Sequence, residues 1–509
     1  MFEPSAFLRV AYWRLGGKKR KVIMSIQRLY QRIRNSAPFQ TLEQRLSEGN
    51  QETLARGISG ALMGFVLSWI EENSVGPVVV VCPSEDQAES VRNDLEQILG
   101  SEVVSYFPGW DVAPYSGRSP HLDVVGLRIE ALDALHRASG GIVVVPVGAL
   151  MGHTLTRDLY SLCVQEFRIG TEFSPVKLSD HLMEIGYERV TTVDGVGQFS
   201  VRGGILDFCS FGNSHPVRVE FWGDEVTSMR TFDLGSQRSV EGIETVRILP
   251  HRETVLPITM ADVYDENLAK AEKKFGMDLT LARDIQQREG LYDGQEHYLG
   301  VVYGEQTGLL DHIASDCLMV LLDPGGISAA AEELWETCED ASSRRRERRG
   351  ELEPLPVEGL LRRPETVMAQ INGMRRVGIL TLGGASTDAV DFGSITGRQY
   401  EGHLPILKED LRRFWMQDYE VVLLCESAGQ QARLEEMLDD SADSVSIYVG
   451  TMHQGFVFEA GRTVLINDHE IYSRYRRKRR YRRLQDGSPI KSVTALHRGD
   501  FVVHVDHGI

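Results

Sequence analysis

The chain has 509 residues, of which 42% are hydrophobic and 25% charged, an ordinary composition for globular domains with sizeable cores. At about 100–200 residues per domain, this length predicts three to four domains. No apolar run approaches the ~18 residues that a membrane span needs, so we exclude a membrane protein and expect a cytoplasmic location. The formal net charge of −18 excludes a global field that attracts nucleic acid.

Phosphate contacts would therefore need local basic segments, and the sequence has two. Residues 9–34 are rich in Lys and Arg but contain no secretory signal. Translation from Met1 and translation from Met24 are both compatible with this segment. The second basic segment reads "RYRRKRRYRR" over 474–483 and includes Arg476, Arg477, Lys478, Arg479 and Arg480. It is either a solvated linker or a tether beside DNA.

Strand–helix alternation begins at "GPVVVVCPSEDQAESVRNDLEQIL", where a run of valines is followed by apolar residues at helical spacing. The same pattern returns near 141–151, at 317–340 and at 418–437. Such alternation predicts parallel sheets covered by helices. The six cysteines form no Cys-x-x-Cys pair and mostly lie in apolar runs, which predicts reduced, buried thiols and no zinc site.

Residues 187–250 have a different pattern of short strands and turn signals. Val217, Val219 and Phe221 alternate with charged residues, which indicates a half-buried antiparallel strand. Gly223-Asp224 is typical of a turn into the next strand. A β-rich unit therefore interrupts the α/β pattern.

Towards the end of the chain, "SSRRRERRGELEPLP" (342–356) indicates an exposed helix end and a linker. The last residues, "LHRGDFVVHVDHGI", predict a turn and a strand that stops at Ile509, and we interpret this as a cut through a domain.

Several catalytic motifs are missing from the sequence. A phosphate loop needs G-x-x-x-x-G-K-[ST], whereas the expected place offers "RGISGALMGFVLSW" (56–69) with glycines and no lysine. There is no H-E-x-x-H and no G-x-S-x-G. Asp224-Glu225 is interpreted as a solvated turn, and the HVDH at 504–507 divides its side chains between two strand faces. We assign no catalytic, cofactor or metal residue.

Three stretches carry a family resemblance: "FPGWDVAPYSGRSPHLDVVGLRIEAL", "GYERVTTVDGVGQFSVRGGILDF" and "HPVRVEFWGDEVTSMRTFDLGSQRSVEGIETVRILP". They resemble the N-terminal region of the bacterial transcription-repair coupling factors, which is itself similar to the excision-repair protein UvrB. The terminal "LHRGDFVVHVDHGI" is similar to the start of the coupling factors' RNA-polymerase-interaction domain. UvrB has an intact phosphate loop and a tyrosine-rich hairpin. Here "WDVAPYSGRSPH" stands in place of the hairpin, and we interpret Trp110 and Tyr115 as packing this loop against the sheet.

The resemblance implies an α/β fold. A degenerate RecA-like or UvrB-like domain with a parallel sheet is interrupted by a β-rich α+β insert, and a second small α/β domain and the truncated start of a β-barrel-like (Tudor/CarD-like) domain follow. The implied boundaries are a basic arm (1–40), UvrB-like domains 1a (41–152), 2 (153–250) and 1b (251–365), an α/β domain of unassigned role (366–472), a basic linker (473–495) and the polymerase-binding start (496–509).

The resemblance also implies that the insert docks UvrA, through Arg189 and Arg202. Gly203 and Gly204 would leave the Arg202 guanidinium unobstructed for a partner carboxylate. Phe199, on an exposed edge, would add an apolar anchor. An internal pair of Arg202 with Glu220 or Asp207 is the alternative. Ser200 stands where UvrB has a basic residue, and "DFCSFG" (207–212) replaces a Phe-Pro-rich turn, so the docking detail departs from the family pattern.

The intact protein implied by the resemblance is an ATP- and magnesium-dependent DNA translocase that displaces stalled RNA polymerase and recruits repair. Its partners would be UvrA, the β subunit of RNA polymerase and double-stranded DNA, and we expect a monomer. ATP and magnesium would bind motor domains outside this chain. Two other functions stay open: a UvrB-like ATP-dependent damage verifier with a diverged loop, and a scaffold that binds neither UvrA nor polymerase.

Overall fold

The computed structural model describes residues 28–472, except 138–139, 256, 258–259, 281–282, 284–292, 305–306, 347–353, 382–387 and 440–444. The described residues divide into two compact units. Residues up to 165 and from 249 onwards form the larger unit, and residues 166–248 form the smaller one. Each unit is described by itself.

A seven-stranded parallel sheet is the centre of the larger unit, with the order β15-β1-β14-β13-β2-β4-β3. The expected valine-rich strands at its middle are confirmed, and their residues are buried on both faces, as in a sheet covered by helices. The strands are β1 (Glu52–Arg56), β2 (Val78–Cys82), β3 (Val104–Tyr106), β4 (Ile142–Pro146), β13 (Leu318–Leu322), β14 (Arg376–Leu380) and β15 (Val390–Asp391).

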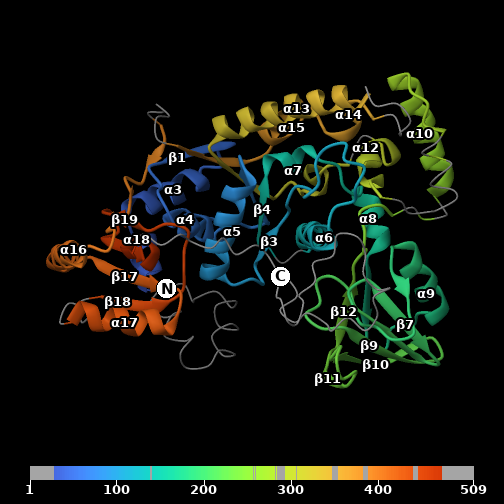
Figure 1. Ribbon diagram of the computed structural model, residues 1–509, viewed down its shortest axis with the longest axis horizontal. Helices are drawn as coiled ribbons and strands as arrows, with labels where there is room; N and C mark the ends of the chain where they lie inside the picture. Colours follow the sequence, from blue (N-terminus) through green and yellow to red (C-terminus); the bar gives the residue numbers. More distant parts are fainter. Residues whose placement is uncertain are drawn as a thin grey trace, which may run out of the picture. The chain divides into compact units, whose positions relative to one another are not determined.

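Helices cover this sheet on two sides. One face of the strands, including Val78 and Val80, shares an apolar cluster with α4 (Leu62–Glu72) and α5 (Glu85–Leu99). Helix α13 (Pro324–Arg346) contacts β13, β14 and α7 (Val147–Met151) (Figure 1). α5 begins where Ser84 accepts a hydrogen bond from the amide of Gln87, which caps the helix.

The remaining helices of this layer connect the strands. They are α3 (Ala37–Ser47), α6 (Leu122–His136), α8 (Arg157–Cys163), α10 (Ala261–Phe275), η2 (Gln295–Tyr298), α12 (Leu299–Val302), η3 (Leu309–His312), α14 (Val357–Leu360) and α15 (Pro364–Gly373). None of the helices within the described ranges is both long enough and apolar enough to cross a membrane. All six cysteines are buried and free, as the sequence predicted.

A second, five-stranded sheet lies in the same unit, with the order β16-β19-β20-β17-β18. β17 pairs in parallel with β18 and β20, whereas β19 is antiparallel to its neighbours. Its elements are β16 (Ile395–Thr396), α16 (Leu404–Met416), β17 (Glu420–Cys425), α17 (Ala428–Leu438), β18 (Ser446–Val449), β19 (Phe456–Phe458), β20 (Thr463–Asn467) and α18 (Asp468–Tyr472).

The two sheets share one hydrophobic core. Phe456 and Leu465 of the second sheet belong to the same apolar cluster as Phe65 of α4 and Val80 of β2. The segment 366–472 also contributes β14 and β15 to the first sheet. The sequence boundary at 366 therefore coincides with no boundary between the sheets.

The smaller unit is built on a six-stranded sheet with the order β11-β10-β9-β8-β7-β6, and a two-stranded sheet joins β5 and β12. All neighbours in the larger sheet are antiparallel except β6 and β7. Helix α9 (Pro175–Glu184) contacts β6 and lies beside the strands (Figure 1). The strands are β5 (Gln165–Arg168), β6 (Glu188–Arg189), β7 (Gln198–Arg202), β8 (Ile205–Phe208), β9 (Val217–Trp222), β10 (Glu225–Phe232), β11 (Ser239–Gly242) and β12 (Thr245–Ile248).

Alternation along β9 confirms the predicted half-buried strand. Val217, Val219 and Phe221 are buried, whereas Arg218 and Glu220 are partly exposed. The sheet thus has an apolar inner face and a polar outer face, as is common for antiparallel sheets.

Candidate functional site

The β7–β8 hairpin brings Arg202 to the outer face of the six-stranded sheet. Its turn is Gly203-Gly204, and Gly203 has φ +60°, a conformation that glycine adopts at no steric cost. A Cβ on Gly204 would lie 2.7 Å from the carbonyl oxygen of Phe221, so the hairpin approaches β9 closely. Both glycines are therefore required by the backbone of the turn.

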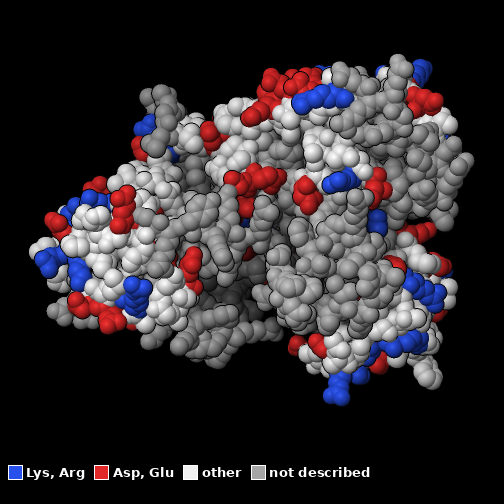
Figure 2. Space-filling view, in the orientation of Figure 1, with Lys and Arg blue, Asp and Glu red and all other residues white. Residues whose placement is uncertain are grey.

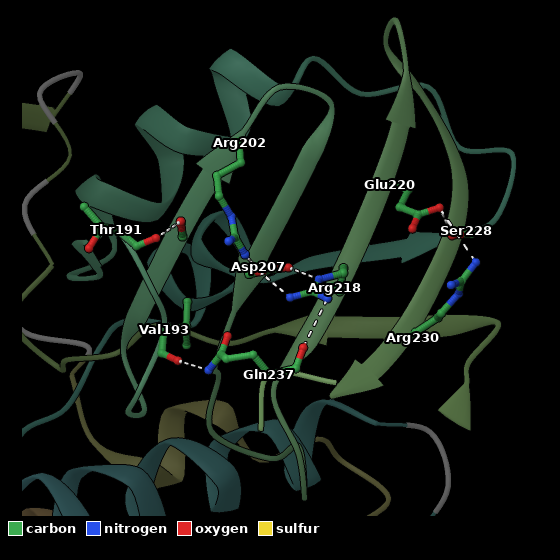
Figure 3. Close-up of polar contacts among 10 residues, drawn as sticks. Thr191, Val193, Arg202, Asp207, Arg218, Glu220, Ser228, Arg230 and Gln237 are labelled. Carbon is green, nitrogen blue, oxygen red and sulfur yellow. Dashed lines mark hydrogen bonds and ion pairs between the residues drawn. The ribbon is translucent and has the colours of Figure 1, made fainter. Parts of the chain in front are cut away.

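Asp207 of β8 accepts hydrogen bonds from two arginines (Figure 3). Arg218, directly opposite on β9, donates from Nε to Oδ1 (2.7 Å) and from Nη2 to Oδ2 (2.9 Å). Arg202, diagonal to Asp207 on β7, donates from Nη2 to Oδ2 (2.6 Å). The side chain of Asp207 is 1% exposed, that of Arg218 17% and that of Arg202 52%. The hydrogen bonds to Asp207 raise the pKa of Arg218, so this cation is fixed in its charged form.

The row of polar side chains continues across β9 and β10. Ser228 donates to Oε2 of Glu220 (2.7 Å), and Arg230 forms an ion pair with the same oxygen at 3.9 Å. Trp222 follows two residues after Glu220, and strand alternation places it on the same face. Its side chain is 82% exposed, which is unusual for a residue of this size.

Loops close one end of the outer face. Ser200 donates to the carbonyl of Thr191, and Gln237 donates to the carbonyl of Val193 (Figure 3). Beneath these loops, Val193 packs with Phe232 and Cys209 in a small apolar cluster. Arg218 also lies over the Phe232 ring, 4.9 Å from its centroid. Arg218 is thus held by packing as well as by charge, whereas Arg202 remains at the open end.

The prediction that Phe199 lies on an exposed edge is wrong, because its side chain is fully buried. In β7, Phe199 and Val201 lie on one face and Ser200 and Arg202 on the other. Phe199 therefore belongs to the inner core of the smaller unit.

The other predicted residues are placed as follows. Arg202 lies on the outer face in an internal pair with Asp207, which was one of the open alternatives, yet half of its side chain reaches solvent. Arg189 is exposed on β6, in register with Phe199. Arg189 is therefore not aligned with Ser200 and Arg202, the positions of β7 that lie on the face drawn in Figure 3.

Sequence reasoning did not select Arg218, Glu220, Arg230 or Trp222 as site residues. A signal for Trp222 existed, since it occupies the polar register of a strand whose apolar register is Val217, Val219 and Phe221. Figure 2 shows basic and acidic side chains interspersed on the visible face of the smaller unit, at the lower right.

The β1–α4 connection occupies the place of a phosphate loop, between a parallel strand and a helix N-terminus. Two of its amides are already used by the chain. The amide of Ser59 donates to Oγ of Ser394 (2.7 Å), and that of Ala61 donates to the carbonyl of Gln454 (2.8 Å). A nucleotide would have to displace both partners.

Space in this connection is also filled. A Cβ on Gly60 would lie 2.3 Å from the carbonyl oxygen of Gly455. The segment contains no lysine to neutralise β- and γ-phosphates. The residues present therefore do not fit ATP.

The loop over residues 110–121 is packed into the protein. Trp110 and Tyr115 belong to an apolar cluster with residues of α13 and α14, so they pack against helices and not against the sheet as predicted. Arg128, 1% exposed, pairs with the buried Glu253 (2.8 Å) and lies over Phe107, which fixes the start of the loop. This loop is a structural element.

Some predictions lie outside the described residues. These are the start of the basic arm (1–27), the linker with Arg476, Arg477, Lys478, Arg479 and Arg480, and the terminal strand (496–509). No cluster of metal-binding side chains occurs among the residues that the structure does describe.

Comparison with known proteins identifies the smaller unit. Residues 166–253 match the family model of the UvrB interaction domain. The chain is 26% identical to the transcription-repair-coupling factor of Bacillus subtilis (94% of this chain, 43% of the relative), 30% identical to that of Myxococcus xanthus (94% and 44%) and 25% identical to that of Escherichia coli (91% and 42%). The chain spans less than half the length of these curated relatives. With a UvrB interaction domain in its centre and a match along nearly its whole length, the chain is similar to the N-terminal part of the transcription-repair coupling factors, as the sequence predicted.

Proposed function

We propose that this chain is the recruiting portion of a transcription-repair coupling factor, which brings UvrA to RNA polymerase stalled at a DNA lesion. Two findings support the proposal. The relatives carry that name, and the unit that interrupts the larger domain matches the UvrB interaction domain. In this proposal, the chain binds UvrA and delivers it to the stalled RNA polymerase.

The observation that carries the proposal is the outer face of the six-stranded sheet. Arg202 and Arg230 are each about half exposed, and Trp222 is almost fully so. Arginine and tryptophan are the residue types that dominate protein–protein hot spots. A protein partner with carboxylates opposite the arginines and an apolar pocket for Trp222 fits this face.

The wider activity is a further proposal, which rests on the resemblance to the coupling factors. We propose that the intact protein is an ATP- and magnesium-dependent DNA translocase that contacts the β subunit of RNA polymerase, and that nucleotide binds outside this chain. The β1–α4 connection supports this division, since its amides bond to Ser394 and Gln454. A fluorescent ATP analogue should not bind this chain, and binding would favour a UvrB-like damage verifier.

Equilibrium binding of the full 509-residue chain to immobilised UvrA tests the docking proposal. Arg202→Ala and Trp222→Ala should each weaken binding by roughly thirtyfold or more, because truncating a hot-spot residue costs about 2 kcal/mol or more. Arg168→Ala is a matched control, since Arg168 is an exposed arginine of the same unit with an acidic partner, Glu166, outside the row. Equal affinity of all the variants would contradict the proposal.

A further inference from the structure

The ion cluster on the outer face has one more positive than negative charge. Asp207 supplies one carboxylate, and both Arg202 and Arg218 bind it. Arg218 is bound bidentately and is mostly buried, so the unbalanced charge is presented at the exposed Arg202.

Glu220 does not cancel this excess. It lies close enough to add to the stabilisation of charged Arg218, and it also pairs with Arg230 on the next strand. Over the whole row, three arginines face two carboxylates. The cluster is thus one acidic group short of balance.

Arg202 is also held in place before any partner arrives. Its described hydrogen bond uses Nη2 alone, so Nε and Nη1 keep their donors for another acceptor. Arg218 fixes the Asp207 carboxylate by the bidentate contact and is itself fixed over Phe232. Figure 3 shows Arg202 reaching down to Asp207 from the end of β7.

We propose that Asp207 is the positioning residue for docking: it holds the Arg202 guanidinium in the orientation that receives one carboxylate of the partner, and Arg218 is its support. The inference rests on the proposed function, in which UvrA is that partner. A freely rotating arginine loses side-chain entropy when it binds, and an arginine already held by Asp207 loses less.

A simple charge count gives the opposite expectation, which makes the inference testable. Asp207→Asn removes a negative charge beside Arg202 and should strengthen attraction for an acidic partner if charge alone matters. If Asp207 positions Arg202, the same change should weaken binding, by roughly two- to tenfold, the usual cost of ordering one long side chain.

The experiment is a double-mutant cycle on the full chain, with UvrA affinity measured for the parent, Arg202→Ala, Asp207→Asn and the double variant. We expect Asp207→Asn to weaken binding in the parent and to change nothing once Arg202 is alanine. Tighter binding of Asp207→Asn, or equal effects in both backgrounds, would overturn the inference.

Folding is monitored by thermal melting of each variant. Should Asp207→Asn not fold, Arg202→Lys gives a second test, since lysine keeps the charge but not the fork that bridges two carboxylates. Full affinity of Arg202→Lys would also overturn the inference. Full affinity of Arg202→Ala, in contrast, would mean that the proposed function itself fails at this face.

Discussion

Phe221 and Trp222 are consecutive residues of β9 that lie on opposite faces of the sheet, one 8% and the other 82% exposed. Truncating each to alanine should therefore give opposite results. Phe221→Ala should lower the stability of the smaller unit by about 3–5 kcal/mol, because it leaves a cavity in the core. Trp222→Ala should leave stability within about 0.5 kcal/mol and weaken UvrA binding.

Thermal melting and UvrA affinity measured on the same two preparations check this prediction. If Trp222→Ala melted much earlier than the parent, Trp222 would be a packing residue and not an anchor.

The two residues of the Arg202–Asp207 ion pair should differ in their effect on stability. Arg202→Ala should cost less than about 1 kcal/mol, since a half-exposed ion pair contributes little. Asp207→Ala should cost about 3 kcal/mol, because it leaves the mostly buried Arg218 without its counter-ion. Urea unfolding followed by amide exchange in β8 and β9 measures both.

Arg218→Met is the informative companion to that pair. It removes the cation that binds both oxygens of the Asp207 carboxylate. It should therefore lower the stability of the smaller unit more than Arg202→Ala does. A ranking with Arg202→Ala as the most damaging change would contradict the assigned roles.

Because the β1–α4 connection is closely packed, we expect Gly60→Ala to lower the thermal stability of the larger unit strongly. Gly60 has φ +56°, and an added Cβ would meet the carbonyl of Gly455. Gly49→Ala is the matched control, because Gly49 has φ +74° but nothing within 4 Å of an added Cβ. Both variants carry the ~1 kcal/mol strain of a left-handed residue, and only Gly60→Ala adds the clash.

Differential scanning calorimetry on the two glycine variants checks this. Equal melting temperatures would show that the connection is not clamped by the segment around Gly455.

Acid should destabilise the larger unit below about pH 6.5. Burial lowers the pKa of His153 to about 3 and those of His251 and His297 to about 4. Between these values and the ordinary pKa of 6.5, the unfolded chain binds protons that the folded one does not, so stability falls as pH is lowered, by up to about 1.4 kcal/mol per pH unit for each histidine. Burial raises the pKa of Glu85 and Glu296, and these carboxyls offset part of the loss.

Melting temperatures between pH 7.5 and pH 5 measure this loss. His153→Gln should flatten the dependence, whatever its effect at neutral pH, whereas His121→Gln, at an exposed position, should not. If the melting temperature of His153→Gln depended on pH as steeply as that of the parent, His153 would not contribute to the acid destabilisation.

Several elements of the fold could be predicted because their signals are local. The run Val78–Cys82 and the alternation of Val217, Val219 and Phe221 each indicate burial within a few residues. The same rule applies to Phe199, which alternates with Ser200 and Arg202 and is buried, so the expectation of an exposed edge departs from the local pattern.

Contacts between strands could not be predicted in the same way. Asp207 meets Arg218 only through the register of β8 and β9, and no local pattern fixes a register. Likewise, β14 lies between β1 and β13 in the first sheet, although it follows β1 by more than 300 residues in the chain. The residues of a strand do not indicate which strands will be its neighbours across such a long connection. The candidate site is formed by residues of several strands, so the sequence predicted Arg202 but left its partner open between Glu220 and Asp207, and it did not predict that Arg218 shares Asp207.

The ends of the smaller unit are neighbours. β5, where the chain enters it, is hydrogen-bonded to β12, where the chain leaves, and the amide of Ile169 donates to the carbonyl of Glu244. A module whose two ends lie together can be added to or removed from a host chain without threading a strand through the host's sheet. This construction makes the smaller unit a self-contained insertion, which a host chain can gain or lose while the order of strands in its own sheet stays unchanged.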